Sequence, residues 1–144
     1  EMVSCWMALD DTSSQGGTIE YIRGSHTWGA GERSVAFHGP DDPLIDVERA
    51  AKKAGIAAYD RAALELSAGD VVFHHGWVWH GSAENRSERP RRSLVMHCMS
   101  SEARFHETEV TPVYSRYKRH GSTEMDESFF PILWREDGYR SSFL

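Results

Sequence analysis

A histidine, a serine and an arginine lie close together in the stretch WVWHGSAENRSERPRRS, which covers residues 77–93. His80 follows an apolar run and precedes a glycine, so its imidazole can point into the mouth of a sheet structure, where a neutral ring nitrogen can bind a divalent metal. Arg91 is expected to open the next strand, so its guanidinium can lie near the same mouth and offer a planar fork of N–H donors to a carboxylate. These residue types indicate a site for a metal, for an organic acid, or for both.

Each of these residues also has an ordinary structural role. A histidine such as His80 can be hydrogen-bonded in a core or at its rim, and Ser82 can simply help to form a turn. Arg91 can be a solvated cation in a turn that holds three further arginines. Arg92 competes with it, because a slip of one residue along a strand exchanges the inward and outward faces. The residues alone leave these alternatives open.

Composition excludes several classes of protein. The chain has 144 residues, of which 40% are hydrophobic, and this predicts one domain over residues 1–144. No apolar run approaches the roughly 20 residues that cross a bilayer. The net charge of -6 and the lack of a basic face argue against nucleic acid as a partner. Cys5 and Cys98 lie in apolar runs and are expected to pack rather than to pair, which suits a cytoplasmic protein.

Alternating polar and apolar residues predict several strands. The run from Val3 to Leu9 is followed by a loop rich in turn-forming residues and by a second run from Thr18 to Ile22, so the two are expected to form a hairpin-like pair. Further strands are expected at Val71–His75 and Arg91–Met99. Arg91 shares the face of its strand with His97.

One helix is expected over Leu44–Ala54, starting at Asp42-Pro43 and closed by Gly55, and a shorter one near Val113–Lys118. Strands outnumber helices, which favours an antiparallel sandwich or barrel, with a jelly roll first. A mixed α+β domain and part of a larger β structure are the alternatives.

Two adjacent histidines, His74 and His75, lie in the strand that precedes His80. Successive residues of a strand face opposite ways, so at most one of the pair can point inward. We expect structural or pocket-lining roles for them.

Taken together, the sequence resembles the phytanoyl-CoA dioxygenase family of Fe(II)- and 2-oxoglutarate-dependent oxygenases. The likeness runs through residues 5–26 (CWMALDDTSSQGGTIEYIRGSH) and 66–94 (LSAGDVVFHHGWVWHGSAENRSERPRRSL) and, more loosely, through 126–140 (DESFFPILWREDGYR). It implies a mainly β fold, a double-stranded β-helix or jelly roll with one or two helices. It also implies Fe(II) as cofactor, 2-oxoglutarate as cosubstrate, and O2 and a small-molecule substrate as partners.

The resemblance carries over to four residues. His80 falls where the family has the distal histidine of its iron site, and Arg91 where it has the arginine that pairs with the far carboxylate of 2-oxoglutarate. Ser82 matches a neighbour that can hydrogen-bond the same carboxylate, and Trp6 a pocket-lining tryptophan. No residue is predicted to act as a catalytic acid, base or nucleophile.

The family's remaining iron ligands, the histidine and the acid of an H-x-D or H-x-E motif, have no match in the sequence. None of the eight histidines has an acid two positions further on, and His106 is followed directly by Glu107. In the family this motif precedes the strand that corresponds to Val3–Leu9. We therefore expect the chain to be the C-terminal part of an oxygenase, with a jelly roll incomplete at the N-terminus. The alternative is a relative that has lost its iron site.

The predicted function is hydroxylation of a small-molecule C–H bond, without turnover by the 144 residues alone. The helix Leu44–Ala54 is expected to cover the pocket mouth and to influence substrate choice. A jelly-roll module that uses Arg91 to bind an organic acid without metal is one alternative, and a purely structural role is another.

Overall fold

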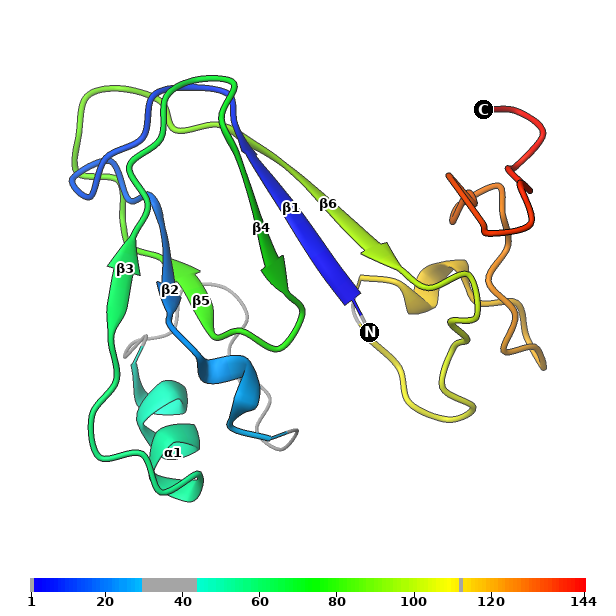
Figure 1. Ribbon diagram of the computed structural model, residues 1–144, viewed down its shortest axis with the longest axis horizontal. Coiled ribbons are helices and arrows are strands. Elements are labelled where there is room, and N and C mark those ends of the chain that lie inside the picture. The colour runs from blue at the N-terminus through cyan, green and yellow to red at the C-terminus, as the bar shows by residue number, and fades with distance from the viewer. Residues whose placement is uncertain (1, 30–43, 112) are drawn as a thin grey trace. The chain divides into compact units, whose positions relative to one another are not determined.

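The computed structural model describes residues 2–29, 44–111 and 113–144. The chain divides into two compact units, Glu1–Cys98 and Met99–Leu144. Strands dominate the first unit, whereas the second consists mainly of turns around the short 3-10 helix η2, Ser115–Tyr117 (Figure 1). A single domain over the whole chain stays a prediction.

Two three-stranded sheets make up most of the first unit. In each of them the strand that comes first in the sequence is the central one. One sheet has the order β4 (Val71–His75), β1 (Met2–Ala8), β6 (Ser93–Met99), and the other has the order β3 (Arg61–Ala63), β2 (Ile19–Ile22), β5 (His80–Ser82). The prediction of a mainly β chain is confirmed (Figure 1).

Antiparallel pairing fixes which side chains share a face. In the first sheet Ser4 lies opposite His74 on β4, and two residues further along the same face Trp6 lies opposite Val72. On the other side of β1, the Leu9 N–H donates to the carbonyl of Arg92 at 3.0 Å, at the start of β6. In the second sheet β2 is antiparallel to both of its neighbours.

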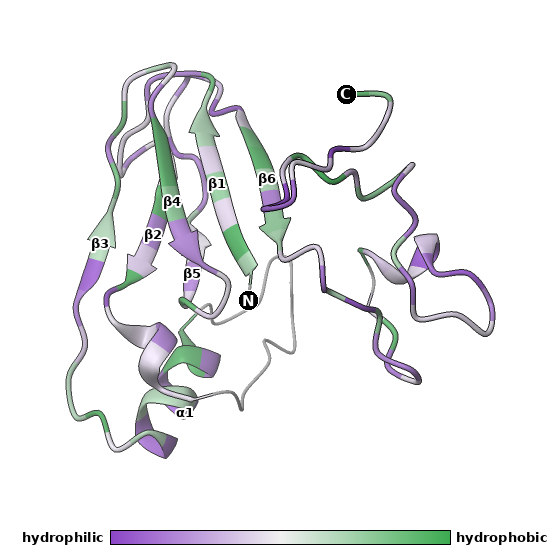
Figure 2. Ribbon diagram, turned by 45° about the vertical axis from the view of Figure 1, so that its right-hand side comes forward, coloured by the Kyte–Doolittle hydropathy of each residue, from purple (hydrophilic) through white to green (hydrophobic). Residues whose placement is uncertain are grey.

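The core lies between the two sheets. Trp6 and Ala8 of β1 pack with Ile19 of β2, and the half-buried side chains around them are Tyr21, Leu64, Leu66 and Val72. The opposite face of the first sheet is also apolar but open, with Phe73 68% exposed. Figure 2 shows the hydrophobic stretches along β4 and β6. Ser4, Trp6 and Ala8 lie on the side of β1 that is buried throughout, and on the opposite side Cys5 is buried whereas Val3 is exposed.

The predicted hairpin between the first two strands is wrong. β1 and β2 lie in different sheets, so the segment between them crosses from one sheet to the other. Thr12 holds this crossing in place, because its N–H donates to the carbonyl of Leu66 at 2.8 Å and its hydroxyl donates to that of Leu64 at 3.0 Å. Alternation identifies the face of a strand but not its partner.

The predicted helix is present as α1, Ile45–Lys53. It ends as expected at Gly55, which has a φ of 73° and donates its N–H to the carbonyl of Lys52 at 3.1 Å. The Ile56 N–H then bonds the carbonyl of Ala51 at 2.9 Å, and together the two bonds form a Schellman cap. The predicted start at Asp42-Pro43 lies outside the described residues.

The short helix expected at Val113–Lys118 is the single 3-10 turn η2. A second 3-10 turn, η1 (Ser25–Thr27), follows β2. Among the described residues, no helix has the length and apolar character that a membrane crossing requires.

Gly17 and Gly55 provide a matched test of the crossing between the sheets. Both have positive φ, 67° and 73°, but a Cβ on Gly17 would collide with the carbonyl oxygen of Ala83, whereas nothing lies within 4 Å of one on Gly55. We expect Gly55→Ala to lower the free energy of unfolding by about 1 kcal/mol. Gly17→Ala adds a backbone collision and should cost about 3 kcal/mol or more.

Urea unfolding of the full-length protein, followed by circular dichroism, measures both losses. Equal losses in the two variants would contradict the close approach of the crossing to Ala83.

Candidate functional site

Polar side chains gather at one end of the inner faces of the two sheets. His74 comes from β4, His80 from β5 and His97 from β6. The rings of His74 and His80 lie 4.6 Å apart between centroids, and Tyr21 of β2 lies beside both of them. Four strands of two sheets thus contribute to one cluster, which we call the histidine cluster: Tyr21, His74, His80 and His97.

His80 has the geometry of a metal ligand. Its Nδ1 lies 2.8 Å from the carbonyl oxygen of Val78. Because a carbonyl can only accept, Nδ1 carries the proton, and in the neutral ring this leaves a lone pair on Nε2. A histidine that binds a metal commonly donates its other N–H to a carbonyl in this way. His80 is solvent-exposed, so Nε2 is accessible from outside the core.

His74 is the inward member of the His74–His75 pair. It is 9% exposed, and its Nδ1 lies 2.7 Å from the hydroxyl of Tyr21. Burial raises the pKa of Tyr21 to about 12, so the phenol stays protonated. Burial, with smaller contributions from the nearby His80 and His97, lowers the pKa of His74 to about 4, so its ring is neutral at pH 7. Its Nε2 is buried and has no hydrogen-bond partner.

His97 extends the cluster to the central strand β1. Its Nδ1 lies 2.8 Å from the hydroxyl of Ser4, which is almost fully buried. Burial and the neighbouring His80 lower the pKa of His97. Alternation along β6 places Ser93 and Val95 on the same face as His97, and the same alternation continued backwards reaches Arg91.

Arg91 and Arg92 lie in different environments. Arg92 forms a two-pronged ion pair with Asp10, with Nη2 2.6 Å from Oδ1 and Nε 3.0 Å from Oδ2, and its side chain is 69% exposed. Arg91 is half-buried, and its Nε is buried without a partner. The carboxylate of Asp10 therefore holds Arg92 outward and leaves the guanidinium of Arg91 available for another anion.

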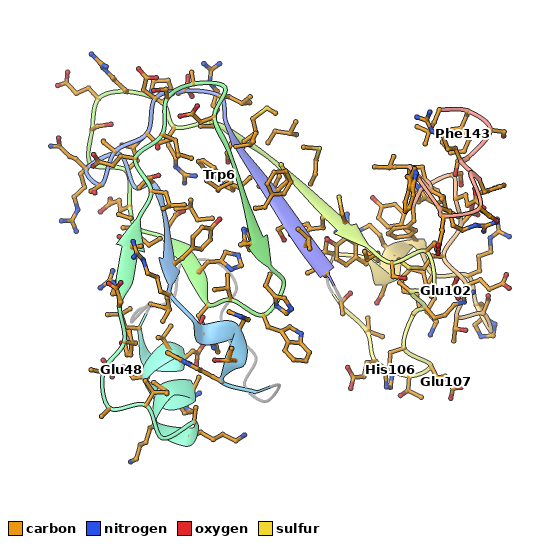
Figure 3. All side chains as sticks on the ribbon, in the orientation of Figure 1. Trp6, Glu48, Glu102, His106, Glu107 and Phe143 are labelled. Carbon is orange, nitrogen blue, oxygen red and sulfur yellow. The ribbon has the colours of Figure 1, made fainter. Side chains whose placement is uncertain are left out.

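Ser82 and Trp6 each lie two residues along their strand from the level of the histidine cluster: Ser82 from His80 on β5, and Trp6 from Ser4 on β1. Ser82 pairs with Ile19 across β5 and β2, and its side chain is exposed. Trp6 is 4% exposed and packs in the core on the side of β1 that faces the other sheet (Figure 3). The structure thus brings His80 and Ser82 together on β5, with Trp6 on the facing sheet. It shows Trp6 as a core residue.

The donor set fits 2-oxoglutarate and one part of an iron site. A buried guanidinium nitrogen without an acceptor suits a carboxylate, and an accessible imidazole Nε2 suits Fe(II). In the part of the chain that the structure describes, no three His, Cys, Asp or Glu side chains are placed to hold a metal ion together. Nε2 of His80 is thus available as a single metal ligand, and a metal site here would require others.

Sequence reasoning missed Tyr21 as a member of the cluster. It assigned only a strand to that segment, and no spacing rule links Tyr21 to His74 or to His80 across 53 and 59 positions. The link depends on the cross-strand register of β2 with β5, in which Tyr21 lies opposite His80.

Comparison with known proteins identifies the family. The family model for phytanoyl-CoA dioxygenase (PhyH) matches residues 1–93, and the chain belongs to this family, as the sequence predicted. The dioxygenase cdmD of Talaromyces verruculosus is 26% identical over 140 residues, which cover 97% of this chain and 36% of that protein. The chain spans about a third of the length of the curated relatives it matches.

Two solved structures share the fold. The non-heme alpha-ketoglutarate-dependent carbocyclase SnoK from nogalamycin biosynthesis matches with a TM-score of 0.59 and 23% identity, over 87% of this chain and 46% of that one. The epimerase SnoN in complex with Fe3+, alpha-ketoglutarate and nogalamycin RO matches with a TM-score of 0.51 and 23% identity, over 69% of this chain and 36% of that one.

The ion pair that separates Arg91 from Arg92 can be tested with acid. Hydrogen bonds from the side chain and the backbone N–H of Arg92 lower the pKa of Asp10 to about 2, below its ordinary value of 3.8. The pair therefore stabilises the fold above about pH 4, and this contribution disappears as the pH falls through about 2. Asp10→Asn lacks the contribution at every pH.

We expect the wild-type protein to be more stable than Asp10→Asn at pH 6, with the difference shrinking between about pH 4 and pH 2. Urea unfolding at a series of pH values measures this. A constant difference across that range would show that Asp10 does not hold Arg92 through its charge.

Proposed function

We propose that the protein acts as an Fe(II)- and 2-oxoglutarate-dependent dioxygenase that hydroxylates a C–H bond of a small molecule, on a double-stranded β-helix. The proposal is supported by membership of the family and by the fold shared with alpha-ketoglutarate-dependent enzymes. The observation that carries it is the partnerless, buried Nε of Arg91, a donor whose missing acceptor a ligand carboxylate can supply.

Each proposed residue has a separate task. His80 would hold the iron through Nε2, with its ring oriented by the Val78 carbonyl. Arg91 would bind the far carboxylate of 2-oxoglutarate as a permanently charged, bidentate donor, and Ser82 would add its hydroxyl. Trp6 would form the apolar wall that excludes water beside the chelate. When bound, iron and 2-oxoglutarate supply the oxidation by O2 of a substrate C–H bond, with succinate and carbon dioxide as co-products.

The other two iron ligands are proposed to come from sequence outside residues 1–144, as the histidine and acid of an H-x-D or H-x-E motif. Support comes from the family's ligand pattern and from the absence of that spacing after all eight histidines. The coding sequence immediately upstream of Glu1 tests this directly. An upstream sequence without such a motif would favour a relative that has lost its iron site.

A second candidate is a module that binds an organic acid without metal. It is favoured by the lack of a three-residue metal cluster among the described residues, because Arg91 and Ser82 could bind an acid without one. The two functions differ in their response to a chelator.

Chelation separates the two candidates. In the full-length protein, we expect 2-oxoglutarate to bind with at least about ten-fold lower affinity after the metal is removed with EDTA, because the chelate to iron is lost. Isothermal titration calorimetry, with Mn(II) in place of Fe(II), measures the affinity with and without metal. Equal affinity in both conditions would support the metal-independent module.

Replacing Arg91 tests the carboxylate clamp. Arg91→Ala should raise the concentration of 2-oxoglutarate needed for half-maximal succinate formation by about 30-fold or more, because loss of a buried charged partner costs about 2 kcal/mol or more. Arg92→Ala is the matched control and should leave that concentration unchanged, because Arg92 is paired with Asp10.

Steady-state assays of succinate formation give both values. An unchanged requirement in Arg91→Ala, or a raised one in Arg92→Ala, would count against Arg91 as the residue that binds the cosubstrate.

A further inference from the structure

We infer that His74 is a further ligand-binding residue of this site and that its Nε2–H donates a hydrogen bond to the 1-carboxylate of 2-oxoglutarate, the end next to the keto group. The inference rests on the proposed function, which supplies the cosubstrate, and it adds a residue that the sequence comparison with the family did not single out. Four observations on the described residues carry it.

The first is the tautomer of His74. The hydroxyl of Tyr21 lies 2.7 Å from Nδ1, and a phenol can donate to this nitrogen or accept from it; the inference takes the arrangement in which Tyr21 donates. The proton of the neutral imidazole is then on Nε2. His74 thus presents an N–H donor, and Tyr21 fixes both the direction of the ring and the nitrogen that donates.

The second observation is that this donor has no acceptor. His74 is 9% exposed, its Nε2 is buried, and no described group accepts from it. The neighbouring polar groups have other partners: Ser4 and His97 bond each other, and Nδ1 of His80 bonds the Val78 carbonyl. A buried N–H without an acceptor is uncommon in folded proteins, and a bound carboxylate would satisfy it.

The third observation is position. The ring of His74 lies 4.6 Å from that of His80 between centroids. If 2-oxoglutarate binds a metal on Nε2 of His80 through its keto-acid end, the 1-carboxylate would lie nearer to His74 than the far carboxylate does.

The fourth observation is the pairing of two unsatisfied donors. Among the described residues, the buried side-chain nitrogen and oxygen atoms that lack a partner are Nε2 of His74 and Nε of Arg91. Both are donors, and alternation along β6 places Arg91 on the face that carries His97, towards the other end of that strand. A ligand with two carboxylates can accept hydrogen bonds from both donors.

Three variants of the full-length, Mn(II)-loaded protein test the inference through their affinity for 2-oxoglutarate, measured by calorimetry. His74→Phe keeps an aromatic ring without the donor and should weaken binding about ten-fold or more. His74→Gln places an amide N–H near the position of Nε2 and should bind within about three-fold of the wild type. Tyr21→Phe leaves the ring unoriented and should fall between them.

His75→Phe is the matched control. His75 is the next residue of β4, it faces the other way, and its Nδ1 accepts the N–H of Trp77 at 3.1 Å. Its replacement should leave the affinity for 2-oxoglutarate unchanged. Thermal unfolding of each variant checks the fold, and His74→Phe should be at least as stable as the wild type, because it removes an unsatisfied buried group.

The outcomes separate the inference from the function on which it rests. If the wild type binds 2-oxoglutarate and His74→Phe binds it equally well, the inference is overturned while the oxygenase proposal stands. If His74→Gln is as weak as His74→Phe and both melt earlier, His74 is structural and the inference is also overturned. If the wild type itself binds no 2-oxoglutarate with Mn(II), the proposed function fails. Should His74→Phe not fold, His74→Gln and Tyr21→Phe decide the question.

Discussion

Packing of Trp6 and Ala8 against Ile19 joins the two sheets, and the position of every site residue depends on it. This contact makes the side of β1 that carries Ser4, Trp6 and Ala8 the inner one. The pairing register then determines which residues of the neighbouring strands face inward, because a residue opposite an inner residue must also face inward. His74 on β4 is inner because it pairs with Ser4, and His80 lies beside it because it pairs with Tyr21 on the facing sheet.

The inner faces are therefore apolar at the core and polar at the end where the histidine cluster lies. Burying an imidazole is costly unless it is neutral and hydrogen-bonded, and of the three histidines His74 is the buried one. The structure meets this cost in part, through the Tyr21–His74 and Ser4–His97 bonds and through depressed pKa values of His74 and His97. Two buried donors are left without a partner, Nε2 of His74 and Nε of Arg91.

Sequence patterns predicted the strands β1, β2, β4 and β6, the helix end at Gly55 and the family, because alternation, turn chemistry and motif order are local properties, but they did not predict the short strands β3 and β5. They failed for the pairing of β1 with β2, because a crossing and a hairpin use the same turn-forming residues. The choice between Arg91 and Arg92 stayed open in the sequence, since it depends on the remote carboxylate of Asp10. The Tyr21–His74 bond was equally out of reach, because it joins two sheets.

The proposed function depends most on His80 and Arg91 binding the two ends of one metal-bound 2-oxoglutarate on the inner faces. A crystal structure of the full-length protein, grown without oxygen with Mn(II) and 2-oxoglutarate, tests this most directly. The account predicts the metal on Nε2 of His80 and the far carboxylate of 2-oxoglutarate on the guanidinium of Arg91. Metal bound away from His80, or a 2-oxoglutarate whose far carboxylate pairs with another residue while Arg91 stays without a partner, would contradict it.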